Sequence, residues 1–197
     1  MTEERLQRLF SGDNAGLTVC VGSWKAYNEC NEHALGSCLK TSDGKIHFYI
    51  DFMELEGSDE LREALYAIGW SEAEMEETFV QDYCSGWAEI EDCDHQNAFD
   101  LADFIYEHRD EIDGNEEKLK AIMEMEADSI ELAIEYLEDY DYRDGMTPDE
   151  YAMEITEESL GDFPEWVSRY IDYDVMGRDM VLNGDIIETE DGLLIRY

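Results

Sequence analysis

The sequence predicts an α+β fold divided into small domains, and three observations support this. The chain has 197 residues, 44% of them hydrophobic, which is enough to bury a core. Its 12 Tyr, 7 Phe, 4 Trp and only 2 Pro are typical of packed, ordered structure. Apolar residues alternate near both ends of the chain but recur at helical spacing between them. We therefore predict an N-terminal extension (residues 1–16), an α+β domain (17–90), a helical domain (91–141) and a second α+β domain (142–197).

The first α+β domain is predicted from three β-type segments and one helix. Residues 17–24 (LTVCVGSW) and 45–55 (KIHFYIDFMEL) are expected to be strands, as is 77–85. Residues 58–69 are expected to form a helix that ends at Gly69. After it, SEAEM contains the Ser and Glu spacing of a capping box.

The rest of the chain is predicted to be mainly helical, with helices at residues 97–110, 115–125 and 128–139. A further helix should begin with the segment TPDE, where Thr, Pro and Glu stand at the cap, first and third positions, and end at Gly161. Residues 164–182 are expected to continue as helix. The final segment, GDIIETEDGLLIRY, predicts a hairpin.

The charge of the chain restricts the partners that it can bind. Against 52 Asp and Glu there are only 13 Lys and Arg, a formal charge of -39, whereas about 2 to 8 charges keep a small domain soluble. Residues 1–50 hold six acids and five bases, but residues 51–150 hold thirty-four acids and five bases. Such a charge excludes direct binding to nucleic acid or to an anionic membrane. The partners should be basic.

Acidic residues recur on three predicted helices at steps of three and four residues, which places them on one helix face. The pattern favours a surface that presents rows of carboxylates to a basic partner. The first stripe is Asp100, Asp103, Glu107 and Asp110, the second is Asp128, Glu131, Glu135 and Glu138, and the third is Glu150, Glu154 and Glu157.

The spacing of these stripes falls in the range of a DNA phosphate row. A helix rises about 1.5 Å per residue, so a stripe carries one charge about every 5 Å, and one strand of B-DNA carries one per ~3.4 Å. The net charge of the chain equals the phosphate charge of about 20 base pairs of DNA. Three other interpretations of the stripes remain: an ordinary solvated helix face, adaptation to high salt and a cation-buffering protein. Adaptation to high salt should also charge residues 1–50, which are nearly neutral. A cation-buffering protein would need ligand loops, but no acidic turn has the spacing of an EF-hand loop.

The residues that usually mark an enzyme or a metal site are not arranged as such. The four His form no HExxH motif, and GxSxG and Walker sequences are missing. Residues 92–95 (DCDH) are more typical of a helix cap than of a metal site. The five Cys lack CxxC pairing, which fits reduced thiols in a cytoplasmic protein, and neither a leader nor a membrane span is indicated. We expect no enzyme activity, catalytic residue, metal or cofactor.

Three segments together resemble the ArdA-type antirestriction proteins, which are DNA mimics. The most specific is residues 168–186, SRYIDYDVMGRDMVLNGDI, and the others are residues 21–29 (VGSWKAYNE) and 79–87 (FVQDYCSGW). Cys30 stands at the family's glycine after the Tyr-Asn turn, and Gly177 stands where Ala is usual. The residues of the motif and its expected dimer contact are Arg169, Tyr170, Asp172, Tyr173, Asp174, Arg178 and Asp179.

The resemblance implies an elongated chain of three small domains that forms a homodimer through the C-terminal one. It implies that the chain inhibits type I restriction-modification enzymes by occupying the DNA groove of their methyltransferase and specificity core. The alternative is an acidic mimic directed at a nucleoid protein, a repressor or a CRISPR effector. Within the motif, Arg169 and Arg178 are expected to pair with nearby Asp residues and to hold the fold or the dimer together.

Overall fold

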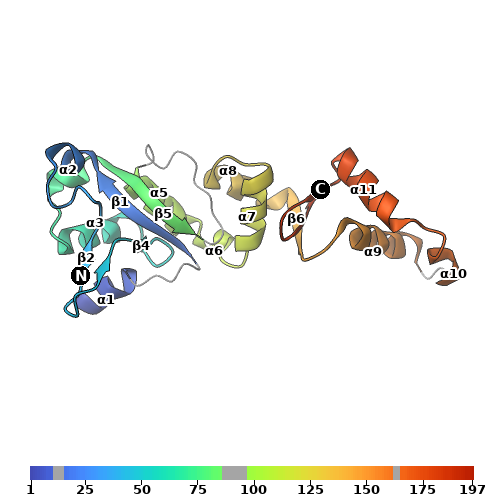
Figure 1. The fold of residues 1–197 in the computed structure, drawn as a ribbon, viewed down its shortest axis with the longest axis horizontal. Coiled ribbons are helices and arrows are strands. Elements are labelled where there is room, and N and C mark those ends of the chain that lie inside the picture. The colour runs from blue at the N-terminus through green and yellow to red at the C-terminus, as the bar shows by residue number, and fades with distance from the viewer. Residues whose placement is uncertain (11–15, 86–96, 162–164) are drawn as a thin grey trace. The chain divides into compact units, whose positions relative to one another are not determined.

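The structure is a computed structural model that describes residues 1–10, 16–85, 97–161 and 165–197 (Figure 1). The chain forms two compact units, Met1–Gly114 and Asn115–Tyr197, and both contain helices and antiparallel strands. The predicted α+β class is therefore confirmed. The boundary between the units falls inside the predicted helical domain of residues 91–141, and the division into three domains stays a prediction.

A three-stranded antiparallel sheet forms the centre of the N-terminal unit (Figure 1). Its middle strand, β1 (Leu17–Ser23), is buried along its whole length and pairs with β4 (Ile50–Asp51) and β5 (Thr78–Ser85). The β1–β5 register shifts by a bulge between Cys20 and Val21. The strands predicted at residues 17–24 and 77–85 are thus confirmed.

The single strand predicted at residues 45–55 is wrong, because the chain changes sheets within it. Residues Ile46–His47 (β3) pair with Leu39–Lys40 (β2) in a separate ribbon, and β4 then joins β1. Between the two strands, the carbonyl of Phe48 accepts a hydrogen bond from the Ser37 hydroxyl at 2.6 Å. A side chain therefore satisfies the backbone at the point where the chain leaves one ladder for the other.

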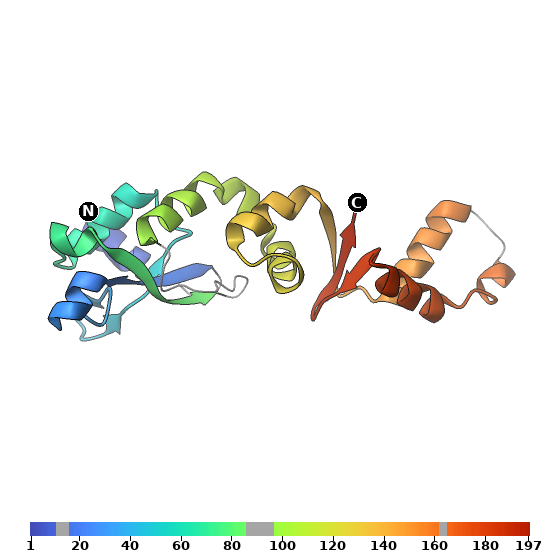
Figure 2. The same cartoon turned by 90° about the horizontal axis from the view of Figure 1, so that it is seen from above.

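Helices cover the sheet of the N-terminal unit, and Figure 2 shows α3 and α5 on the same side of it. Their buried faces contribute Leu61, Leu65, Leu101 and Ile105, each with 0% exposure. The helix predicted at residues 97–110 is two helices that meet at His108, which ends α5. The helices are α1 (Glu3–Leu9), α2 (Trp24–Glu29), α3 (Ser58–Ala67), α4 (Glu72–Met75), α5 (Ala98–Glu107) and α6 (Arg109–Ile112).

The C-terminal unit has a three-stranded antiparallel sheet in the order β6-β8-β7. Strands β7 (Ile186–Glu188) and β8 (Gly192–Arg196) form the predicted hairpin, and their buried side chains Ile186, Leu193 and Ile195 make a small apolar core. Strand β6 (Tyr140–Asp144) pairs with β8 along its whole length and was not predicted.

The helices of the C-terminal unit are shorter than predicted at two places. Residues 128–139 contain α8 (Ile130–Glu135) followed by a 3₁₀ turn, η2 (Tyr136–Glu138). Residues 164–182 contain α10 (Glu165–Ser168) and a second helix that starts anew, because the Asp172 side chain caps it by accepting the Val175 N–H at 3.1 Å. The remaining helices are α7 (Glu116–Met125), α9 (Pro148–Leu160) and α11 (Tyr173–Asn183).

Both predicted capping boxes are present, Ser71 with Glu74 and Thr147 with Glu150. The thiols of Cys20, Cys30, Cys38 and Cys84 are free, as predicted, while Cys93 and the segment 92–95 lie outside the described residues. In the described ranges, no helix has the length and apolar character needed to cross a membrane.

Candidate partner-binding surface

The first acidic stripe lies on α5 and α6 of the N-terminal unit, and all four of its side chains are exposed. They are not equivalent. The Asp103 carboxylate accepts a hydrogen bond from the Ser58 N–H at 2.7 Å, at the first residue of α3. Because Gly57, which precedes that helix, has no side chain for the purpose, Asp103 supplies the cap from a neighbouring helix. Asp100, Glu107 and Asp110 complete the stripe.

The second stripe does not follow one continuous α-helix. Asp128 lies before Ser129, the residue that caps α8, while Glu131 and Glu135 lie on α8 and Glu138 lies on η2. In a 3₁₀ turn, side chains three residues apart eclipse one another, so Glu135 and Glu138 still share a face. Asp128, Glu135 and Glu138 are exposed, whereas Glu131 is half-buried.

The third stripe lies on α9, where two of its carboxylates also serve the local fold. Glu150 closes the capping box by accepting the Thr147 N–H at 3.1 Å. Glu154 lies 3.9 Å from the Arg143 guanidinium, and Glu157 is exposed. In the first and third stripes, then, some acids hold the chain's own backbone or cations, and the others face solvent.

Many basic side chains interact within the chain and do not neutralise the stripes. Lys120 pairs with Asp191 at 2.7 Å, and Arg62 pairs with Glu72 at 3.1 Å while lying over the ring of Phe99. Lys118 is half-buried and donates to a backbone carbonyl, and its burial lowers its pKa. The exposed stripes therefore keep a strongly negative potential.

The residues of the C-terminal motif lie around α11. Arg169 and Tyr170 are in the turn before it, and Tyr170 is 84% exposed. Asp172 is the cap of α11, and the exposed Asp174 and Asp179 lie on the helix.

Two other motif residues face the rest of the C-terminal unit. The hydroxyl of Tyr173 is buried without a hydrogen-bond partner in the described part of the chain. Arg178 and Asp174 line a cavity of about 240 Å³ with Pro148 and Asp149 at the start of α9 and with Glu188 of β7. Arg178 thus lines the same cavity as three acidic residues, at the junction of α9, α11 and the sheet.

A comparison with protein families relates this chain to known proteins. The family model for the antirestriction protein ArdA matches residues 19–194, most of the chain, including the three segments that resemble ArdA. This chain belongs to the ArdA family. A search of curated proteins found no match. The resemblance deduced from the motifs is confirmed, and antirestriction is the activity that the ArdA family implies.

The structure shows the conformation of Cys30, the first of the two positions at which the sequence is expected to differ from the ArdA pattern. Cys30 ends α2 in the left-handed conformation (φ 52°, ψ 39°), with its N–H directed to the carbonyls of Ala26 and Tyr27. This conformation costs a residue with a Cβ about 1 to 2 kcal/mol, and glycine adopts it freely. The turn therefore has a geometry that favours glycine, although Cys occupies it here.

The second departure lies where α11 crosses the start of α9. A Cβ built on Gly177 would lie 2.5 Å from the carbonyl carbon and oxygen of Pro148 and 2.8 Å from the backbone N of Asp149. Backbone atoms cannot move aside as a flexible side chain can. In this ArdA protein the close approach of the two helices requires glycine at position 177.

Among the described residues, no group of three or more His, Cys, Asp or Glu side chains is placed to hold a metal ion.

Proposed function

We propose that this chain is a DNA mimic that inhibits type I restriction-modification enzymes by occupying the DNA-binding groove of their methyltransferase and specificity core. The observation that carries the proposal is the presence of exposed carboxylate rows in a chain that uses many of its bases to bind its own acids and carbonyls. Carboxylates fixed on helices replace phosphates against the enzyme's Lys and Arg, and no chemical step is required of the inhibitor. The proposal agrees with the antirestriction activity of the ArdA family.

The proposed binding surface is the exposed part of the three stripes. Its attraction to a basic groove should weaken steeply with salt, because exposed charges separated by more than about 8 Å are screened at physiological ionic strength. The same charge repels DNA, so the inhibitor acts on the enzyme and not on its substrate.

We also propose that the active form is an elongated homodimer built of three small domains per chain, which pairs through the C-terminal region. Three large apolar side chains of that region are exposed on or beside α11: Tyr170 (84%), Leu182 (74%) and Val175 (43%). Burial of such side chains in a contact between two copies would remove apolar surface from water. Arg178, which lines the cavity described above, lies on the same helix.

A comparison of targets tests the proposed function. The purified chain is titrated into cleavage and methylation assays of a type I enzyme, and in parallel into DNA-binding assays of a nucleoid protein, a repressor and a CRISPR effector. Inhibition of the type I enzyme near one equivalent, with the other proteins unaffected, supports the proposal. Selective inhibition of one of the others would replace it with the alternative mimic.

A further inference from the structure

Helix α1 precedes the residues that the family model matches, yet it is packed into the N-terminal unit. Leu9 and Phe10 are 0% and 3% exposed, and Leu6 is 8% exposed. The Thr2 side chain caps the helix by accepting the Arg5 N–H at 3.2 Å. Residues 1–10 of the predicted extension are therefore packed into the unit.

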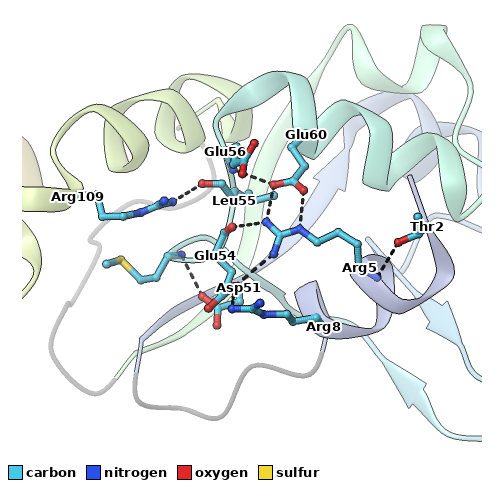
Figure 3. Close-up of polar contacts among 10 residues, drawn as sticks. Thr2, Arg5, Arg8, Asp51, Glu54, Leu55, Glu56, Glu60 and Arg109 are labelled. Carbon is cyan, nitrogen blue, oxygen red and sulfur yellow. Dashed lines mark hydrogen bonds and ion pairs between the residues drawn. The ribbon is translucent and has the colours of Figure 1, made fainter.

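The Arg5 side chain on α1 binds Glu54, which lies between β4 and α3, and Glu60 of α3 (Figure 3). Its Nε and Nη2 contact both carboxylate oxygens of Glu60 at 2.7 and 2.9 Å. Its Nη2 also donates to the Glu54 carbonyl at 2.6 Å, and its Nη1 donates to the Glu54 carboxylate at 3.3 Å. A two-pronged guanidinium bond of this kind fixes direction as well as distance, which a lysine could not do.

Backbone groups of residues 54–58, which we name the hub loop, bond to four helices. Besides the bond from Arg5 of α1, the Leu55 carbonyl accepts from Arg109 of α6 (Figure 3). The Glu56 N–H donates to Glu60 of α3 at 2.8 Å, and the Ser58 N–H donates to Asp103 of α5. The hub loop thus joins α1 to the two helices that carry the first acidic stripe.

The hydrogen bond from Arg5 lowers the pKa of the Glu60 carboxyl, and the positive charges of Arg5 and Arg109 lower it further. Arg109 directly precedes Asp110 of the stripe. Without Arg5, the Glu60 carboxylate would lose its two-pronged partner and the Glu54 carbonyl would lose its bond from α1, while the ion pair of Arg8 with the Glu54 carboxylate would remain.

On the basis of the proposed function, we propose that Arg5 is a positioning residue for partner binding: through the hub loop it holds α5 and α6 so that Asp100, Glu107 and Asp110 keep their register against a basic partner. Arg5 itself need not touch the partner. Its guanidinium is held by the chain's own carboxylates.

The matched control is Arg8, on the same helix. Arg8 contacts the Glu54 carboxylate at 2.6 Å and is 65% exposed, whereas Arg5 is 26% exposed and also binds both carboxylate oxygens of Glu60. Arg5→Gln and Arg8→Gln remove the same charge, so their long-range electrostatic effects match. Arg5→Lys keeps the charge but loses the two-pronged bond, and it tests the proposal even if Arg5→Gln fails to fold.

Hydrogen exchange of the full chain gives the first readout and does not depend on any partner. Arg5→Gln and Arg5→Lys should speed exchange in residues 54–58 and 99–112 relative to Arg8→Gln, with residues 115–161 unchanged. Equal exchange in the Arg5 and Arg8 variants would overturn the proposal.

A double-mutant cycle gives the second readout, the affinity for a type I methyltransferase core at low salt. Arg5→Lys should weaken binding several-fold in the wild-type background. It should have no such effect in a background with Asp100→Asn, Glu107→Gln and Asp110→Asn, because the charges that Arg5 positions are then absent. The same loss in both backgrounds, or no effect of the triple substitution, would overturn the positioning role. If the wild-type chain does not bind the enzyme, the proposed function itself fails, whatever the exchange shows.

Discussion

The Asp103 carboxylate of α5 accepts the backbone N–H of Ser58, the first residue of α3, at a distance of 2.7 Å. An acid that the sequence assigns to a partner-facing stripe is therefore also a helix cap for a neighbouring helix. Asp103 is therefore a structural member of the first stripe, whereas the other members face solvent. Substitutions at these two kinds of position should affect the stability of the fold differently.

Asp103→Ala should lower the free energy of unfolding by about 1 kcal/mol, the usual cost of losing a helix cap. Asp100→Ala, at an exposed position on the same helix, should change it by less than about 0.5 kcal/mol. Urea unfolding of both variants measures the difference. Equal stabilities would mean that the Ser58 N–H is satisfied equally well by water.

Neutralisation of the exposed members of the second stripe, by Asp128→Asn, Glu135→Gln and Glu138→Gln together, should weaken inhibition of a type I enzyme. It should also raise stability slightly, because it relieves repulsion among like charges. The control with the same charge change is Glu3→Gln, Glu4→Gln and Glu32→Gln, all exposed in the nearly neutral first fifty residues. Inhibition constants that rise equally in both variants would show that net charge, and not this surface, determines binding.

Gly177→Ala should destabilise the C-terminal unit by about 1 to 3 kcal/mol, the usual cost of overpacking. The added Cβ would meet the Pro148 carbonyl at 2.5 Å, and this outweighs the gain of about 1 kcal/mol that alanine brings to a helix. Asp179→Ala, exposed on the same helix, controls for helix propensity. A more stable Gly177→Ala variant would show that α9 and α11 can move apart.

Cys30→Gly should raise the free energy of unfolding by about 0.5 to 1 kcal/mol. It removes the left-handed strain of about 1 to 2 kcal/mol, and the greater freedom of glycine in the unfolded chain offsets part of the gain. Cys30→Ala removes the thiol but keeps the Cβ, so it should bring no such gain. Thermal unfolding in a reducing buffer compares the three proteins, and a gain for alanine equal to that for glycine would contradict the strain account.

Glu74 should make the stability of the N-terminal unit depend on pH. Burial raises the pKa of its carboxyl, but hydrogen bonds from Ser71, His33 and Asn31 together lower it from 4.5 to about 2. A depressed folded pKa means that the stabilisation is complete above pH 4.5 and is lost as the pH falls toward 2. Glu74 is 5% exposed, and the shift corresponds to about 3 kcal/mol.

Glu74→Gln should therefore be less stable than the wild type at pH 7, and the difference should shrink between pH 4.5 and 2. The control is Glu76→Gln, at an exposed residue of the same segment. Denaturant unfolding across this pH range measures both differences. A difference for Glu74→Gln that does not change with pH would contradict the depressed pKa.

Patterns local to the sequence predicted much of the fold. Both capping boxes, the buried strand β1, the strand β5 and the final hairpin follow from spacing and residue type alone. Strand β6 was not predicted, because its residues, Tyr140–Asp144, come directly after a segment with helical spacing. They pair with a strand some fifty residues later in the sequence. Such a pairing depends on contacts distant in the sequence and is not visible in local periodicity.

The stripes were predictable in spacing but not in the roles of their members. The contact of Asp103 with Ser58 spans 45 residues, and that of Arg5 with Glu60 spans 55. The sequence also does not predict that α1 binds the hub loop. Arg5 and Arg8 cannot be distinguished from the sequence, because their different roles depend on partners far along the chain. Folding thus assigns some charges of a polyanionic chain to internal bonds and others to the surface.

The most direct test of the central claim is competition between this chain and DNA for one enzyme. The purified protein is titrated into a type I methyltransferase bound to labelled target DNA, at low and at physiological salt. DNA mimicry predicts stoichiometric displacement of the DNA, with an affinity that falls steeply as the salt concentration rises. DNA that stays bound at both salt concentrations would contradict the claim that the acidic stripes occupy the DNA groove.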